Sequence, residues 1–330
     1  MRKKSKICAL LLIVALVLTA FAACGNNDEP PTPPGDEDVF NIGIIQLMEH
    51  PALDAAREGF MAALANAGIS AVYDYQNAQG DSATLSTIAQ RFVNNDADLV
   101  LAIATGSLQA MFAETDTIPI IGTAITSFER AGVVNSNAAP GYNVTGTSDM
   151  NPIEAQIKMI LEFVPDMETL GIAYSTNEPN SVYQAELARG YAEALGLTVI
   201  EGTVTTTGDV QQNMLSLAAR ADAVWIPTDN THADAMPIVA QVSLDTGVPV
   251  FPGEENMVMG GGIATLSINY FELGYQAGVM AIQILRGEGE PATMPIQFAQ
   301  RYNYILNGFM IDELEIDIPE RYLNYVQFPE

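Results

Sequence analysis

Few side chains in this sequence are suited to covalent or metal chemistry. The chain has two histidines, His50 and His232, two cysteines, Cys8 and Cys24, and one lysine beyond residue 6, Lys158. Two histidines cannot build a multi-histidine metal site, and both cysteines precede the globular part, which excludes thiolate zinc sites, cysteine nucleophiles and disulfide frameworks there. Lys158 falls in the middle of a helical pattern, which favours a solvated side chain over a Schiff base. We therefore expect no metal ion and no cofactor.

The common catalytic sequence patterns are missing as well. There is no G-x-x-x-x-G-K-[ST] phosphate loop and no G-x-S-x-G nucleophile elbow, and the glycines at 260–262 lack the dinucleotide-binding spacing. Glu49 and His50 could pair as a base and its orienting group, but a histidine at a strand end more often lines a pocket. The sequence predicts a protein that is not an enzyme.

The charge balance narrows the range of partners. Lys and Arg total 13 against 40 Asp and Glu, which gives a formal net charge of −27. A surface this acidic repels phosphate backbones and anionic lipid headgroups, so the sequence predicts no nucleic-acid partner.

The N-terminal segment has the pattern of a targeting signal. Basic residues precede an apolar run at 7–21, which is shorter than the ~20 residues of a membrane-spanning helix. Residues 22–25, Ala-Ala-Cys-Gly, resemble a bacterial lipoprotein cleavage site, although Phe21 stands where leucine is usual. We expect a signal peptide over 1–23 and a diacylglyceryl anchor on Cys24, which would hold the protein at the membrane. The alternative is an ordinary secretory signal with an accidental cysteine.

After the anchor the composition changes twice. Residues 24–39 are acidic and rich in proline, which predicts an extended, solvated tether. From Phe40 onward, short apolar runs alternate with helical periodicity, and the length of 330 residues predicts two domains. The expected strands are 41–46, 71–75, 99–104, 118–121 and an edge-like 143–147 in a first series, and 170–174, 197–201, 223–227, 248–251 and 263–268 in a second.

This alternation predicts an α/β protein with two doubly wound parallel sheets. In open parallel sheets, ligands bind beyond the carboxyl ends of the strands, and two such edges facing each other form a polar cleft between domains. The segments that follow the expected strands are rich in hydroxyls, amides and acids: 46–50, 105–107, 123–124, 177–181, 228–230, 253–255 and 269–270.

Six segments, spread over nearly the whole chain after the tether, carry a resemblance to a known family. They are 44–54, 74–81, 143–149, 227–231, 253–255 and 270–274. In this order they resemble ABC-transporter substrate-binding lipoproteins, in a group that includes tryptophan-, tyrosine- and phenylalanine-binding members. Two places depart from the family pattern. Residues 127–130, Ser-Phe-Glu-Arg, replace an aspartate–proline pair, and Pro179 replaces an alanine.

The resemblance implies a type I periplasmic-binding fold, with hinge crossings near Ser148, Tyr270 and Gly289. The implied lobes are 40–147 plus 271–289 and 148–270 plus 290–330, so that the helix after Tyr270 returns to the first lobe. It also implies a position on the extracytoplasmic face of the cell membrane, which is the periplasmic side if an outer membrane exists. The implied partners are a small ligand and ABC permease subunits, with ATP hydrolysis in a separate ATPase.

An amino-acid ligand, aromatic or branched, would need an acceptor for its ammonium and donors for its carboxylate. Asp229 is the expected ammonium acceptor, with a helix-capping role as the alternative. Donors for the carboxylate are expected where helices begin, at Thr105, Gly106, Ser107, Asn180 and Ser181.

Further residues complete the expected site. Met48, His50 and Tyr270 are expected to line the side-chain pocket, although Met48 and Tyr270 could equally serve packing. One of Glu254 and Glu255 is expected to be a structural acceptor. Gln46, Thr123, Asn230 and Glu254 are the remaining candidates.

Two other functions are compatible with parts of this pattern. The same fold could bind a sugar or a nucleoside, for which aromatic rims would be expected. A membrane-anchored hydrolase would need a nucleophile–base pair, which the sequence does not offer.

Overall fold

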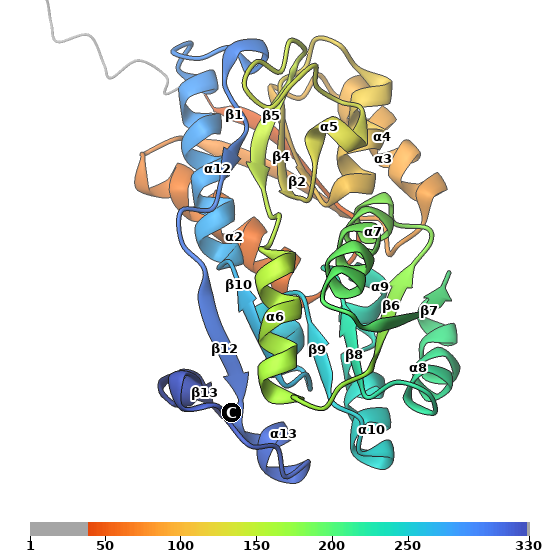
Figure 1. Ribbon diagram of the computed structural model, residues 1–330. Helices are drawn as coiled ribbons and strands as arrows, with labels where there is room; N and C mark the ends of the chain where they lie inside the picture. The colour runs from red at the N-terminus through yellow and green to blue at the C-terminus, as the bar shows by residue number, and fades with distance from the viewer. Residues whose placement is uncertain (1–38, 329–330) are drawn as a thin grey trace, which may run out of the picture. The chain divides into compact units, whose positions relative to one another are not determined.

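Strands and helices alternate along residues 39–328, the part of the chain that the computed structural model describes (Figure 1). The signal peptide expected over 1–23 and almost all of the tether expected over 24–39 lie outside the described residues. Within the described part, none of the helices has the length and apolar character needed to cross a membrane.

The first lobe is built on a six-stranded sheet in which all neighbouring strands run parallel, in the order β11-β5-β4-β3-β1-β2. Three of its inner strands, β3, β4 and β5, are buried along their whole length, as expected for a sheet covered on both faces. The strands are β1 (Phe40–Gln46), β2 (Ala71–Asn77), β3 (Leu99–Ile103), β4 (Ile120–Ile125), β5 (Val144–Ser148) and β11 (Gln297–Phe298). The helices between them are α2 (Pro51–Asn66), α3 (Ser82–Asn94), α4 (Thr105–Glu114) and α5 (Phe128–Ala131).

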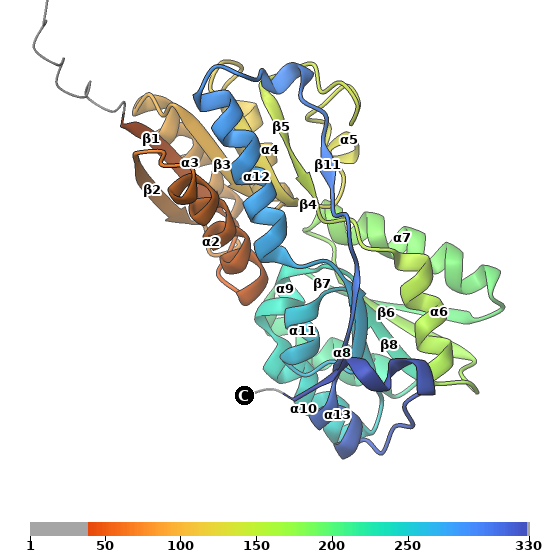
Figure 2. The same ribbon diagram turned by 90° about the vertical axis from the view of Figure 1, so that its left-hand side faces the viewer.

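Helix α12 (Tyr270–Leu285) returns to this first lobe and packs against α2 (Figure 2). Glycines let the two backbones approach closely. A Cβ on Gly274 would overlap the carbonyl oxygen of Ala56, and one on Gly59 would overlap the carbonyl oxygen of Phe271. The buried side chains of α12, among them Leu273 and Ala277, therefore join the core of the first lobe.

The second lobe contains a parallel sheet in the order β7-β6-β8-β9, with a separate core on each face. Its strands are β6 (Thr169–Ser175), β7 (Thr198–Val204), β8 (Ala223–Ile226) and β9 (Val250–Pro252). Its helices are α6 (Ile153–Phe163), α7 (Pro179–Ala194), α8 (Val210–Ala218), α9 (Asn230–Asp234), α10 (Met236–Thr246) and α11 (Glu255–Met259), with a 3₁₀ turn at Thr207–Asp209.

A third, small sheet completes this lobe, in the order β10-β12-β13. It consists of β10 (Ala264–Ser267), β12 (Asn303–Asn307) and β13 (Val326–Gln327), with helix α13 (Gly308–Glu313) and a 3₁₀ turn at Glu320–Tyr325 nearby in the chain. A further 3₁₀ turn, at Pro291–Thr293, precedes β11 of the first sheet. The strand expected at 263–268 therefore does not extend the second parallel sheet, because β10 runs antiparallel to β12.

Two further expectations need correction at the edge of the first sheet. The strand expected at 143–147 to be edge-like, β5, lies between β4 and β11, so β11 is the edge. Since β11 pairs with β5, the chain returns to the second lobe after Phe298 and not near Gly289. Residues 290–298 thus belong with the first lobe. Their connection to it depends on contacts far apart in sequence, such as the bond from Thr145 Oγ1 to the carbonyl oxygen of Met294 at 2.7 Å.

Replacing Gly274 with alanine should destabilise the protein by about 1–3 kcal/mol, because the added methyl group has no room between α12 and α2. Urea unfolding of residues 39–330, which form one compact unit, measures the change. Gly190→Ala in α7 is the matched control, since no atom lies within 4 Å of the added Cβ. It should stabilise by about 0.4–1 kcal/mol. Equal effects of the two substitutions would contradict the close packing of α12 on α2.

Candidate ligand-binding site

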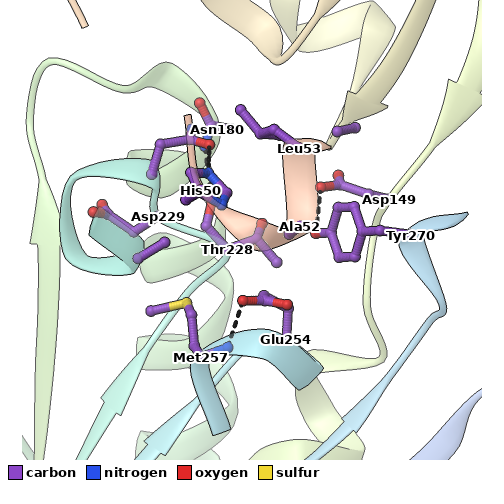
Figure 3. Close-up of a pocket in the computed structure, with 13 residues that line it drawn as sticks. His50, Ala52, Leu53, Asp149, Asn180, Thr228, Asp229, Glu254, Met257 and Tyr270 are labelled. Atoms are coloured by element: carbon purple, nitrogen blue, oxygen red, sulfur yellow. Dashed lines mark hydrogen bonds between the residues drawn. The ribbon is translucent and has the colours of Figure 1, made fainter. Parts of the chain in front are cut away.

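A pocket lies between the two lobes, at the carboxyl ends of strands from both parallel sheets (Figure 3). Its volume is about 20 Å³, which is room for about one water molecule, so the lobes are closed on each other. The lining residues are His50, Ala52, Leu53, Ala124, Asp149, Asn180, Thr228, Asp229, Asn230, Ala233, Glu254, Met257 and Tyr270.

Asp149 and Tyr270 form one wall of the pocket, and each stands at a crossing between the lobes. Tyr270 Oη donates to Asp149 Oδ2 at 2.9 Å, and Thr126 Oγ1 donates to Asp149 Oδ1 at 3.1 Å. Burial raises the pKa of Asp149 to about 6, and the two hydroxyl donors only partly offset this effect. Burial also raises the pKa of Tyr270 well above its ordinary value, so the phenol stays a proton donor.

A hydrogen bond between His50 and Asn230 joins the lobes directly. His50 ends the loop after β1, Asn230 begins α9, and His50 Nε2 lies 2.9 Å from Asn230 Oδ1. Asn230 Nδ2 donates to Glu178 Oε2 at 2.5 Å, so its Oδ1 faces His50 and His50 Nε2 must carry the proton. Burial lowers the pKa of His50, and the bond to Asn230 and nearby carboxylates offset this only in part. Its Nδ1 is buried without a hydrogen-bond partner.

Asp229 caps helix α9. Its Oδ1 accepts from the backbone N–H of His232 at 2.8 Å and from His232 Nδ1 at 2.7 Å, and its Oδ2 accepts from the backbone N–H of Ser175 at 2.6 Å. Burial acts to raise the pKa of Asp229, but the charge of His232 and these hydrogen bonds outweigh it and lower the pKa. In Figure 3 its carboxylate turns away from the other lining groups. The capping alternative for Asp229 is therefore the one that the structure contains.

Glu254 caps helix α11 and also faces the pocket. Its two oxygens accept from the backbone N–H groups of Met257 and Asn256, each at 2.7 Å. Burial raises the pKa of Glu254 to about 7, although the two N–H donors lower it. Glu255 instead points to Asn269, whose Nδ2 donates to its Oε1 at 3.1 Å, and it does not line the pocket.

The charges around the pocket are unbalanced. Asp149, Asp229 and Glu254 are each at most 4% exposed, whereas no lysine or arginine is among the lining residues described above. His232 lies beside Asp229, whereas Asp149 and Glu254 have no cationic partner among the lining residues. Buried carboxylates without such a partner are costly, and they are stabilised by positive charge. The arrangement is thus suited to a ligand that carries an ammonium or another cationic group.

Six of the thirteen residues that the sequence singled out line this pocket: His50, Asn180, Asp229, Asn230, Glu254 and Tyr270. Gln46 does not, because its side chain bonds the carbonyl oxygen of Met48 and Asp54 Oδ1, each at 2.9 Å. Thr123 Oγ1 instead pairs with Thr147 Oγ1 at 2.9 Å. Met48 turns toward Gly80, and Ser181 pairs with Asn180.

The three candidates at the start of α4, Thr105, Gly106 and Ser107, also lie outside the pocket lining. Yet Thr105 Oγ1 and Ser107 Oγ are buried without a hydrogen-bond partner. The residue before α4, Ala104, has φ 76°, and Ala124, which lines the pocket, has φ 55°. Non-glycine residues in this left-handed region are strained, and such strain clusters at functional sites. Ala104 donates its N–H to the carbonyl oxygen of Thr123 at 3.1 Å, which places the start of α4 beside the strand residue that precedes Ala124 of the lining.

The sequence interpretation missed seven lining residues. Asp149 and Thr228 could have been found, since they come within two residues of the ends of expected strands, in segments that resemble the family. The others are apolar residues, which only the folded arrangement brings to the pocket: Ala52, Leu53, Ala233 and Met257 in helices and Ala124 in β4.

Two lobes of this fold with a polar pocket between them define a solute-binding protein. The chain belongs to the ABC transporter substrate binding protein family, whose model matches residues 41–327. Members of this family are solute-binding proteins and not enzymes, as the sequence predicted, and the type I periplasmic-binding fold is confirmed as well.

Among its relatives is a tyrosine-binding protein of Clostridioides difficile (strain R20291), 35% identical over 325 residues, which cover 96% of this chain and 94% of the relative. A Streptococcus pneumonia ABC domain solved in complex with L-Trp is 34% identical, with a TM-score of 0.85 over 88% of this chain and 100% of that one. The ligand-free, open structure of a substrate-binding protein with adhesive properties from Clostridium difficile is 37% identical. Its TM-score is 0.68 over 88% of this chain and 100% of that one. The higher score against the ligand-bound relative agrees with the closed pocket.

Replacing Glu254 with glutamine should flatten the pH dependence of stability between pH 4.5 and 7. The folded-state pKa is about 7 and the ordinary value is 4.5, so the folded protein keeps a proton that the unfolded chain releases. Glu254 therefore stabilises below pH 4.5 relative to neutral pH, and this stability, about 3 kcal/mol, is lost as pH rises through 7. Urea unfolding across this range measures the slope.

The control is Glu193→Gln, which makes the same change at an exposed position of α7. It should leave the slope as in the wild type. If the Glu254→Gln and wild-type curves run parallel, the pKa of Glu254 is not raised by its burial in the pocket.

Proposed function

We propose that this protein is the extracytoplasmic solute-binding lipoprotein of an ABC importer, and that it binds an amino acid, aromatic or branched, between its lobes. The observation that carries the proposal is the pair of buried carboxyl groups of Asp149 and Glu254, in a pocket whose lining contains no lysine or arginine. An α-ammonium group would supply the missing positive charge. The relatives named for tyrosine and solved with L-Trp support the same ligand class.

We assign Asp149 as the main acceptor for the ammonium group of the ligand. The sequence pointed to Asp229, but three hydrogen bonds already occupy the oxygens of Asp229, whereas Asp149 accepts only from two hydroxyls. Glu254 faces the same space and adds negative charge. Asp229 contributes to the electrostatic field of the pocket and holds α9 in place.

The ligand carboxylate is assigned to the start of α4. The backbone N–H groups there, with the unpartnered hydroxyls of Thr105 and Ser107, form a donor set that favours an anion. Asn180 offers a further donor from the second lobe. The sequence candidates Gly106 and Ser181 would act only through their backbone or by supporting these neighbours.

The side chain of the ligand needs more room than the closed pocket offers. A second cavity of about 290 Å³ shares His50, Ala233, Glu254 and Met257 with the pocket and extends it along apolar groups such as Met236. Opening of the lobes would join the two spaces. We therefore propose that ligand enters an open form and that closure stabilises the bound state, which the permease reads.

In this proposal the lobes rotate about the three segments in which the chain crosses from one lobe to the other. The first lobe comprises residues 40–148, α12 and the segment to Phe298, and the second comprises the rest, a boundary shifted from the expected one by the pairing of β11. The bond between Tyr270 and Asp149 links two of the crossings, so it lies near the hinge axis.

A sugar or a nucleoside on the same fold is the alternative ligand. The pocket does not favour it, because Tyr270 is the one aromatic residue of the lining, apart from the imidazole of His50, and its hydroxyl is bound to Asp149. A hydrolase has no support from family membership.

A thermal-shift screen of residues 39–330 tests the ligand class. Tyrosine, tryptophan, phenylalanine and branched amino acids are compared with their decarboxylated amines, with sugars and with nucleosides. An amino acid at 100 times its Kd should add about 2.7 kcal/mol of stability. A response to a sugar or nucleoside alone would overturn the proposed ligand while leaving the family untouched.

Asp149→Asn checks the ammonium assignment within the same screen. Loss of the charge should weaken amino-acid binding by about 10- to 100-fold, since charge-assisted hydrogen bonds contribute about 1.5–3 kcal/mol. Asp222→Asn makes the same change at the opposite end of the second sheet, where Asp222 Oδ2 accepts from the N–H groups of Glu168 and Thr169. Equal affinities of the two variants would contradict a role for Asp149 in binding.

The anchor has its own test. Cys24→Ser should prevent lipidation, and the protein should then leave the membrane fraction, because a diacyl anchor is what holds it there. Metabolic labelling with a fatty acid and fractionation of cells measure this. The matched control is Cys8→Ser within the signal peptide, which should keep both label and location. Retention of the label in Cys24→Ser would contradict the anchor.

A further inference from the structure

One ion pair joins the two lobes outside the pocket. Arg130 of α5, in the first lobe, places Nη2 3.0 Å from Glu186 Oε2, and its guanidinium carbon lies 4.6 Å from the ring centroid of Tyr183. Both partners belong to α7 of the second lobe. The other ion pairs found among residues 39–328, such as Arg189 with Glu201, each lie within one lobe.

The first lobe holds Arg130 firmly in this position. Phe128 is fully buried beneath α5, in a space that exists because Gly122 has no side chain. Ser127 Oγ accepts from the backbone N–H of Arg130 at 3.2 Å and caps the short helix. Gln109 Nε2 of α4 donates to the carbonyl oxygen of Ala131 at 3.1 Å. These contacts fix the backbone at Arg130 and so hold its guanidinium group toward α7.

Helix α7 offers a matching surface. Tyr183 and Glu186 are three residues apart and so share one face of the helix. From the same helix, Gln184 Nε2 donates to Thr126 Oγ1 at 3.1 Å, just before α5. The lobes therefore meet at two adjoining points along α7, a buried one at Thr126 and an exposed one at Arg130.

We propose that Arg130, Tyr183 and Glu186 form a latch that stabilises the closed arrangement of the lobes and thereby sets ligand affinity and release rate without contact with the ligand. The inference rests on the proposed closure of the lobes. Separation of the lobes would break the ion pair and the cation–π contact together. Because the pair is half exposed, its effect should fall with salt concentration.

The first experiment needs no ligand. Residues 39–330 contain no cysteine, so Ser86→Cys in α3 and Gln211→Cys in α8, both exposed, allow one spin label in each lobe. Double electron–electron resonance then gives the ratio of open to closed molecules. Arg130→Gln should raise this ratio about threefold at low salt, the size expected for an exposed charge pair with a cation–π contact. At 1 M NaCl the variant and the wild type should converge.

Arg189→Gln is the matched control. It makes the same substitution in an exposed arginine whose Nε lies 2.6 Å from Glu201 Oε1, inside the second lobe. It should leave the ratio unchanged. If Arg130→Gln also leaves the distance distribution unchanged, the latch is overturned.

Exchanging the charges of Arg130 and Glu186 tests whether the two residues act as a pair or each acts only within its own lobe. Arg130→Glu and Glu186→Arg should each favour the open form, and the double variant should return toward the wild-type ratio. A double variant as open as the single ones would overturn the proposal. With L-tryptophan as the probe, Arg130→Gln should also raise the dissociation rate about threefold. Absence of tryptophan binding would count against the proposed ligand, while the label distances would still decide on the latch.

Discussion

The burial of carboxyl groups at the junction of the lobes is the constraint on which the rest of the structure depends. Asp149, Glu178, Asp229 and Glu254 are each at most 6% exposed. Three of them are stabilised by backbone N–H groups at the starts of α9 and α11, and the fourth by two hydroxyls. A parallel sheet brings helix starts to the carboxyl ends of its strands, so this fold supplies the donors that such acids need. The short helices at the cleft therefore donate hydrogen bonds to the acids, in addition to connecting the strands.

The same acids link the pocket to the connections between lobes. Asp149 directly follows β5 and Tyr270 begins α12, so one hydrogen bond joins two crossings and also forms a wall of the pocket. On the other side, Glu178 orients Asn230, and Asn230 in turn bonds His50 of the first lobe. Closure thus aligns both sides of the pocket through the bonds from Tyr270 to Asp149 and between His50 and Asn230. A rearrangement at either crossing would therefore change the surroundings of the buried acids.

The two-lobed fold and part of the pocket lining could be predicted from the sequence, and the features that could not be predicted have physical reasons. Periodicity predicted both parallel sheets, since buried strands and amphipathic helices leave local patterns. It could not predict that β11 pairs with β5, because a two-residue strand has no period and its pairing depends on distant contacts. The polar segments after the strands include His50 and Glu254, which line the pocket. The sequence predicts Asp229 as the ammonium acceptor, with helix capping as the alternative, and it cannot separate the two because both roles need the same residue at a helix start.

The raised pKa values of Asp149 and Glu254, about 6 and about 7, connect electrostatics to motion. In an open form water would hydrate both carboxylates, whereas closure removes that water and leaves no lysine or arginine of the described lining in its place. Closing without a ligand is therefore opposed by desolvation, unless the acids take up protons. In the proposed function, a bound ammonium replaces those protons and makes closure favourable at neutral pH. The surface latch at Arg130 adds its contribution to the same closing equilibrium, from outside the pocket.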